Sequence, residues 1–235
     1  MTLVAVHQPT FLPWLGWWDK LVRADILVLL DDVQFPNSGR TWMNRVRVLV
    51  NGEPQWVTMP VHRSHDGLRT VRQTLADDRK PWRERIAATL DASYRRAAHF
   101  DDVFPVVDEI VRQPTDRIAE LNEGGVRRLA APLGLDTGKL IRQSELDAGG
   151  KATDLLISLC KAVGGTAYLT GDGASGYLEA TKFTASGLEL VEQRFAPPRY
   201  PQLIDEYVPG LSVVDALMNC GWHGTSALIC SSGKT

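Results

Sequence analysis

Apolar residues near the N-terminus fall into a pattern that predicts a strand, a helix and a second strand. Residues 3–6 are continuously apolar, and residues 14–23 repeat large apolar side chains at the spacing of one helix face. Residues 26–30 form another continuous apolar run, which is typical of a strand buried on both faces. The start of the chain is therefore expected to supply two strands of a sheet and a helix that covers it.

The middle of the chain predicts a β-hairpin followed by helices. Residues 45–50 and 55–59 flank the turn sequence Asn51-Gly52-Glu53-Pro54, whose Asn-Gly pair tolerates positive φ. From Trp82 to Leu133 the apolar residues change to helical spacing, which predicts helices over 82–94, 106–111 and 117–133. We interpret this segment as a helical layer or insertion.

The rest of the chain alternates short strands with helices. Strands are predicted at 139–142, 167–170 and 188–191, and helices at 152–163 and after Ser212, which is the expected N-cap. Repeated strand, loop and helix units predict an α/β fold with a mostly parallel sheet flanked by helices. We expect a single domain over residues 1–235, with the hairpin and the mainly helical segment at about 82–133 inside it.

Composition and charge narrow the class of protein. The 235 residues are 44% hydrophobic and carry a formal net charge of -2, so we expect a substantial core and no general attraction to nucleic acid or membranes. The N-terminus lacks the features of a signal peptide, and no apolar run approaches the ~20 residues of a membrane span. We therefore expect a cytoplasmic protein. A local basic patch of Arg40, Arg45 and Arg47 would suit an anionic small molecule.

Polar side chains follow each of the first two predicted strands. His7 and Gln8 come after the first strand, and Asp31, Asp32 and Gln34 come after the second. Open α/β sheets place their chemistry at the carboxyl ends of strands, and an imidazole near a carboxylate suits a general base or acid. The alternatives are that His7 packs beneath nearby tryptophans and that the carboxylates cap turns, a reading that we favour for Asp31 over Asp32.

Glycine-rich and terminal motifs give no cofactor site. Residues 171–176 match the pattern G-x-G-x-x-G, but only a short helical stretch follows, whereas a dinucleotide site must open a long helix. Residues 230–235 resemble the end of a P-loop, and we assign that resemblance to chance or to a flexible tail. We therefore expect no cofactor.

Cysteine and histidine spacing argues against metal and thiol chemistry. Cys160, Cys220 and Cys230 form no pair with disulfide or zinc-site spacing, and neither Cys160 nor Cys220 lies where a helix would activate a thiol. His62 and His65 have too few acidic neighbours for a metal site. We expect metal-free chemistry and free thiols.

Several short motifs, taken together and in order, resemble the WbqC-like family. The resemblance runs from residue 7 to residue 221 and departs from the family at Trp17-Trp18, where phenylalanine or tyrosine is more usual. The matching residues are His7-Gln8-Pro9, Leu12-Pro13-Trp14-Leu15-Gly16, Asp31-Asp32-Val33-Gln34-Phe35, Trp42, Asn44-Arg45, Tyr168-Leu169, Gly171, Tyr177-Leu178, Tyr200-Pro201-Gln202, Leu211-Ser212, Asp215 and Asn219-Cys220-Gly221.

The resemblance implies an acyl or aminoacyl (glycine-type) transferase that acts on an amino sugar or another small amine in a biosynthetic pathway. Such an enzyme needs a base for the amine, donors for the developing oxyanion and a groove for an acyl or aminoacyl carrier protein. We assign His7 as the catalytic base and Asp32 as the group that orients it. The substrate-binding residues expected from the resemblance are Gln8, Gln34, Trp42, Asn44, Arg45, Tyr200, Gln202, Asp215 and Asn219.

Two other classes of function stay open. A nucleotidyl-transfer enzyme could also use His7, but it would need a second basic phosphate clamp that the sequence does not place. A non-catalytic protein that binds a small molecule or nucleotide sugar could use the same residues without reacting.

Overall fold

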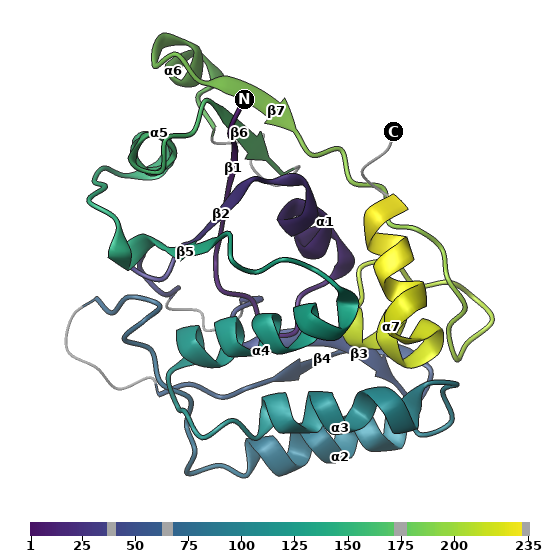
Figure 1. Ribbon diagram of the computed structural model, residues 1–235. Coiled ribbons are helices and arrows are strands. Elements are labelled where there is room, and N and C mark those ends of the chain that lie inside the picture. The colour runs from purple at the N-terminus through teal and green to yellow at the C-terminus, as the bar shows by residue number, and fades with distance from the viewer. Residues whose placement is uncertain (37–40, 63–67, 172–177, 232–235) are drawn as a thin grey trace.

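A parallel sheet of five strands forms the centre of the computed structural model, which describes residues 1–36, 41–62, 68–171 and 178–231 (Figure 1). The strands lie in the order β5-β2-β1-β6-β7, and every neighbouring pair is parallel. Their bounds are β1 Leu3–His7, β2 Ile26–Leu29, β5 Leu140–Arg142, β6 Ala167–Thr170 and β7 Glu189–Glu192. The predicted α/β fold with a mostly parallel sheet is therefore confirmed.

The strand order creates a point at which the chain changes direction across the sheet. From β1 the chain moves outward to β2 and β5, and it then returns past β1 to form β6 and β7 on the other side. The loops that leave β1 and β6 consequently run to opposite faces. In open α/β sheets this switch point, at the carboxyl ends of the strands, is where ligands bind.

Helices cover both faces of the sheet. On one face, α1 (Leu15–Arg23), α4 (Ile118–Leu133) and α7 (Val213–Ser231) share a core cluster with the strand residues Ala5 and Leu27. On the other face, α5 (Ala152–Ala162) and α6 (Ala180–Ala185) pack on Val4, Val6 and Val28 in a second cluster. Because alternate strand residues enter opposite clusters, the continuous apolar runs read from the sequence correspond to strands buried on both faces.

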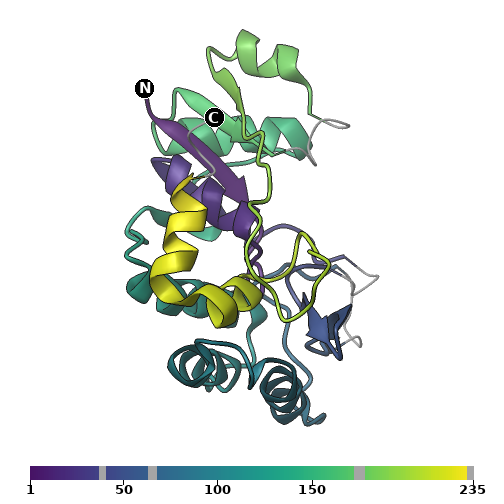
Figure 2. The same cartoon turned by 90° about the vertical axis from the view of Figure 1, so that its right-hand side faces the viewer.

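The long connection between β2 and β5 contains the hairpin and the helical layer. Strands β3 (Arg45–Val50) and β4 (Glu53–Thr58) pair antiparallel, with the turn residues Asn51 and Gly52 both at positive φ. Helices α2 (Trp82–Tyr94) and α3 (Phe100–Val111) pack side by side beyond the hairpin and are seen end on in Figure 2. The predictions of a hairpin at this position and of helices after residue 82 are confirmed.

Two helices are longer than the sequence pattern indicated. Helix α3 starts at Phe100 rather than at residue 106. Pro105 lies inside the helix and does not end it. Helix α7 continues past residue 218 to Ser231 by way of a kink at Gly221, whose φ of 68° is a left-handed conformation suited to glycine. A 3-10 turn, η1 (Gln143–Glu145), follows β5 directly. In the part of the chain that the structure describes, no helix is long and apolar enough to cross a membrane.

Candidate functional site

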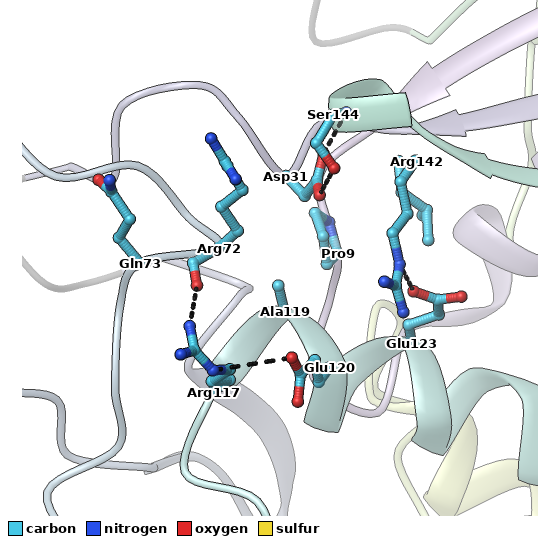
Figure 3. A pocket seen from close by; sticks show the side chains of 11 residues that line it. Pro9, Asp31, Arg72, Gln73, Arg117, Ala119, Glu120, Glu123, Arg142 and Ser144 are labelled. Atoms are coloured by element: carbon cyan, nitrogen blue, oxygen red, sulfur yellow. Dashed lines mark hydrogen bonds and ion pairs between the residues drawn. The ribbon is translucent and has the colours of Figure 1, made fainter. Parts of the chain in front are cut away.

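A cavity of about 220 Å³ lies at the carboxyl edge of the sheet, beyond the ends of β1, β2 and β5 (Figure 3). Residues from these strand ends form one side, and the first turns of α4 with the segment 72–73 form the other. The lining residues are Pro9, Leu29, Asp31, Arg72, Gln73, Arg117, Ala119, Glu120, Glu123, Arg142 and Ser144. The cavity is smaller than a typical drug-sized pocket, so it suits a small polar group.

Charged side chains dominate the cavity. Arg72 Nε lies 2.6 Å from Asp32 Oδ1, and Arg142 Nε lies 2.6 Å from Glu123 Oε2. Arg117 lies 3.8 Å from Glu120 and also donates a hydrogen bond to the backbone carbonyl of Arg72. Three arginines from separate segments thus converge on one small space, where each guanidinium can offer further N–H donors.

Asp31 joins the loop after β2 to the turn after β5. Its side chain is 4% exposed, and its two oxygens accept hydrogen bonds from the Ser144 amide at 2.9 Å and the Ser144 hydroxyl at 2.5 Å. The turn-capping reading that we favoured for Asp31 was a local one, whereas its carboxylate bonds a residue of the turn after β5 that lies 113 residues away in sequence. The same contacts hold the carboxylate at the cavity wall.

Helix α4 is tied to the loop after β1 by a buried amide. Asn122 Nδ2 donates to the carbonyl of Pro9 at 3.0 Å and to the carbonyl of Met43 at 2.7 Å. Since Asn122 is 2% exposed, these bonds are shielded from water and lock the loop, the helix and the start of the hairpin together. The cavity wall formed by α4 is consequently held in place against Pro9.

His7 is the last residue of β1 and lies on the same face of the sheet as Leu29, its partner in register. The ring is half-buried, with Nδ1 3.0 Å from the carbonyl oxygen of Gln8 and the Trp17 ring edge-on at 6.2 Å. A carbonyl can only accept, so Nδ1 carries the proton and Nε2 carries the lone pair of the neutral ring. Burial, together with the nearby ammonium of Lys20, lowers the pKa of His7 to about 3.

Lys20 reaches from α1 toward the end of β6, so it lies at the switch point of the sheet. It is 7% exposed, and a side chain on Gly171 would begin 3.1 Å from its ammonium nitrogen. Gln193 and Asp19 belong to the same buried group, because Gln193 Nε2 donates to Asp19 Oδ2 at 2.8 Å. Burial raises the pKa of Asp19, against the opposing effect of that hydrogen bond.

The other polar groups after β1 and β2 point to separate partners. Asp32 bonds Arg72, and no hydrogen bond or ion pair joins Asp32 to His7 among the described residues. The Gln8 carbonyl accepts from both His7 and the Thr10 hydroxyl, and Gln34 is exposed and pairs through its backbone with Thr70. The orienting role for Asp32 stays a prediction, and in this structure the Gln8 backbone orients the ring.

The predicted residues near the hairpin form a second group. Asn44 is buried and its amide donates to the carbonyl of Met59 at 3.0 Å, which ties the start of β3 to the end of β4. The Arg45 guanidinium carbon lies 4.0 Å from the Trp56 ring centroid, and the Trp42 ring meets Trp56 edge-on at 4.7 Å. These side chains stabilise the hairpin at a location outside the cavity lining.

The C-terminal candidates form a third, buried network centred on Asp215. Tyr94 Oη donates to Asp215 Oδ1 at 3.0 Å and Gln202 Nε2 donates to Oδ2 at 3.0 Å, while Tyr200 supplies a further hydrogen bond. Asn219 donates to the Asp215 carbonyl one turn earlier in α7. Burial raises the pKa of Asp215 despite these bonds, and the carboxylate is fully buried.

The structure therefore separates the predicted site residues into groups. His7 and Gln8 lie beside the switch point, Asp32 reaches the cavity through Arg72, and the Asp215 network packs between α2, the hairpin and α7. The catalytic and binding roles of these residues stay predictions. Residues 172–176 of the glycine motif, together with Arg40, His65 and residues 232–235, lie outside the described residues.

Sequence reasoning missed the three arginines of the cavity. Arg142 ends the strand predicted at 139–142 and Ser144 follows it closely, so the rule applied to His7 and Asp31 would have found them. Arg72 lies in an irregular segment and Arg117 at a helix start, where no local pattern indicates convergence. Among the described residues, no group of three or more His, Cys, Asp or Glu side chains could hold a metal ion.

Fold and cavity together define a parallel α/β protein with a polar site at the carboxyl edge of its sheet. The profile of the WbqC-like protein family matches residues 8–227, and the chain belongs to this family. It is 27% identical over 223 residues to "Uncharacterized protein Rv1507c" of Mycobacterium tuberculosis, with 94% of this chain and 95% of that protein covered. No solved structure matches the chain.

Proposed function

We propose that the protein is an acyl or aminoacyl transferase that acylates a small amine, such as an amino sugar, with the acyl group delivered on a carrier protein. The observation that carries this proposal is His7, a half-buried neutral imidazole at the switch point of a parallel sheet with its tautomer set by the Gln8 carbonyl. That tautomer presents Nε2 as a proton acceptor, as general base catalysis requires.

The proposed reaction uses His7 to move one proton. As the amine nitrogen bonds the acyl carbon of a thioester, Nε2 of His7 accepts the amine proton. The carbon–sulfur bond then breaks, and the same proton passes to the departing thiolate, which leaves an amide and a free thiol. Backbone or guanidinium N–H groups at the carboxyl edge would stabilise the negative charge that develops on the acyl oxygen.

The low pKa of His7 sets a condition on this chemistry. An imidazole with a pKa of about 3 is a weak base, and its pKa is lowered first by burial and then by the Lys20 ammonium. An anionic group of the substrate near Lys20 would offset the ammonium field and raise the pKa of His7 by the smaller, electrostatic part of the shift. The proposal therefore favours a substrate that carries a negative charge, as nucleotide-linked amino sugars do.

Replacement of His7 tests the proposal directly. The His7→Gln variant should lose transfer by about 10²-fold or more, because general base catalysis contributes about that much. The assay incubates protein, aminoacylated carrier protein and amino sugars and detects the mass-shifted amide by mass spectrometry. His223→Gln is the matched control, since His223 is exposed on α7 and should transfer normally. Equal transfer by His7→Gln and the unsubstituted protein would refute the role of His7.

A protein that binds the same ligand without chemistry is the second candidate. The specific observation that favours it is the low pKa of His7, which suits a hydrogen-bond acceptor better than a base. Thermal protection by amino sugars or nucleotide sugars, with no amide product across the panel of donors, would support this candidate. Protection by nucleoside triphosphates would instead favour nucleotidyl transfer.

A further inference from the structure

The charges around the cavity of Figure 3 are balanced in an unusual way for an anion site. Its lining contains three cations, Arg72, Arg117 and Arg142, and three carboxylates, Asp31, Glu120 and Glu123. The sum of these formal charges is zero. Asp32, which pairs with Arg72 from outside the lining, adds one further negative charge. A purely anionic ligand would therefore enter a region without excess positive charge.

Asp31 differs from the other two carboxylates of the lining. Glu123 is paired with Arg142 at 2.6 Å, and Glu120 has Arg117 at 3.8 Å. The hydrogen bonds to Asp31 in the described chain come from the uncharged amide and hydroxyl of Ser144, although the carboxylate is 4% exposed. Arg72 and Arg142 act on Asp31 electrostatically, although the hydrogen bonds to its carboxylate in the described chain come only from Ser144. A buried carboxylate at a cavity wall that accepts only from neutral donors can still take a charge-assisted hydrogen bond from an ammonium group.

The arginines provide the complementary half of the site. Arg72 and Arg142 stand on opposite sides of the cavity in Figure 3, and each contacts its carboxylate partner through Nε. A guanidinium that is engaged at Nε still has N–H groups on its two terminal nitrogens for a carboxylate or phosphate. The negative end of a ligand can therefore bind while the existing ion pairs persist.

We propose that this cavity binds a dipolar ligand, in which an ammonium group and a carboxylate or phosphate lie a few atoms apart. The ammonium contacts Asp31 and Glu120, and the anionic group contacts the terminal nitrogens of Arg72 and Arg142. Two sources carry this chemistry, an α-amino acid and an amino-sugar phosphate. The inference rests on the proposed function only for the role of the ligand in the reaction, where it would be the aminoacyl group that is transferred or the amine that accepts it.

Ligands that differ by one charge test the proposal without any turnover. Isothermal titration calorimetry compares glucosamine 6-phosphate with glucose 6-phosphate and glucosamine, and glycine with acetate and methylammonium. One dipolar compound should bind at least about 10-fold more tightly than both of its single-charge analogues, a difference of about 1.4 kcal/mol. The set that shows this preference identifies the source of the ligand. The proposal would be overturned if neither glucosamine 6-phosphate nor glycine bound more tightly than its single-charge analogues, or if no compound bound.

Substitutions locate the binding in this cavity. Arg142→Gln should weaken the dipolar ligand about 10-fold, and the fold should persist because Glu123 keeps Arg127 at 2.9 Å. The exposed residue Glu120 allows a second variant, Glu120→Gln, which should narrow the preference for the ammonium-bearing compound. Arg128→Gln is the matched control, because Arg128 lies on the same helix, pairs with Glu109 and is outside the lining. An equal loss in Arg128→Gln would refute the assignment.

The two proposals fail separately. If the unsubstituted protein transfers no acyl group to any amine, while His7→Gln still binds the dipolar ligand, the proposed reaction is refuted and the binding site stands. If the protein transfers an acyl group but binds the dipolar ligands no more tightly than their single-charge analogues, the proposed site is refuted and the proposed reaction stands.

Discussion

Removing the hydroxyl of Tyr94 should destabilise the protein by an amount that the structure allows us to work out. Tyr94 is fully buried, and its hydroxyl donates to Asp215 Oδ1 at 3.0 Å while accepting from the Leu49 amide at 3.1 Å. Tyr94→Phe therefore deletes a donor to a buried carboxylate and leaves a buried backbone N–H without its acceptor. The ring and its packing are retained, so the change isolates these two hydrogen bonds.

Each lost bond has a characteristic magnitude. A hydrogen bond to a charged group contributes about 1.5–3 kcal/mol, and an unsatisfied buried donor costs about 1–3 kcal/mol. Because the two effects overlap in one network, we expect the free energy of unfolding to fall by about 2–4 kcal/mol. For a chain of this size each kcal/mol lowers the melting temperature by roughly 2–4 °C, which gives a decrease of roughly 4–16 °C.

The free energy of unfolding that Tyr94→Phe loses should depend on pH. Burial raises the pKa of Asp215 above its usual range, so the folded state binds this proton more readily than the unfolded state does. Stability from this group is therefore present at low pH and is lost as pH rises through the folded pKa. Removing a donor to the ionised carboxylate should cost more at neutral pH than near pH ~4, the ordinary range of a carboxyl group.

Urea unfolding followed by circular dichroism measures the effect, with Tyr207→Phe as control. The Tyr207 hydroxyl donates to the Pro198 carbonyl at 2.8 Å from a half-buried position, so its removal should cost only about 0.5–1.5 kcal/mol. A loss in Tyr94→Phe no larger than in the control would refute the reading of Asp215 as the centre of a stabilising network. Normal substrate affinity in a folded Tyr94→Phe protein would also argue against substrate binding by that network.

Three further predictions concern other parts of the fold. Nitrogen-15 NMR should show the His7 ring neutral from pH 5 to pH 8, because its pKa is lowered to about 3. Between about pH 3 and 6.5 the folded state binds fewer protons at His7 than the unfolded chain does, so the free energy of unfolding should rise with pH over this range. The His7→Gln variant should show a flatter rise. Gly165→Ala should cost about 1–3 kcal/mol in urea unfolding, since the added carbon would lie 2.5 Å from a valine of β1, whereas Gly149→Ala, with open space around it, should be neutral. Ellman's reagent should modify the exposed Cys230 in the folded protein and Cys160 only on unfolding, because burial raises the pKa of Cys160 to about 12; rapid modification of Cys160 in the folded state would contradict its placement.

Local patterns were sufficient for much of the fold. Strand β6 was predicted with its exact bounds, and the Asn51-Gly52 turn was predicted from residues that tolerate positive φ. The errors lie at helix ends, as in α3, which starts at Phe100 although the pattern predicted a start at residue 106. Such signals act within a few residues, so they are visible without knowledge of the fold.

Local sequence patterns predicted only part of the candidate site. His7 and Asp31 were found because they follow strands, and Arg142 follows the same rule. The pairing of Arg72 with Asp32 joins residues 40 apart, and that of Tyr94 with Asp215 joins residues 121 apart. No local pattern specifies which distant groups meet, because that depends on how the strands order and on which helices cover them.

The sequence by itself determined the class of this protein: parallel strands with helices between them, a hairpin, a helical layer, and polar residues at the ends of strands. Periodicity carries that information because each element must bury its own apolar face. Only the tertiary structure decided that the chain reverses between β1 and β6, which puts His7 and Lys20 at the switch point. It also decided that three arginines and three carboxylates share one cavity, because long-range packing alone brings those segments together.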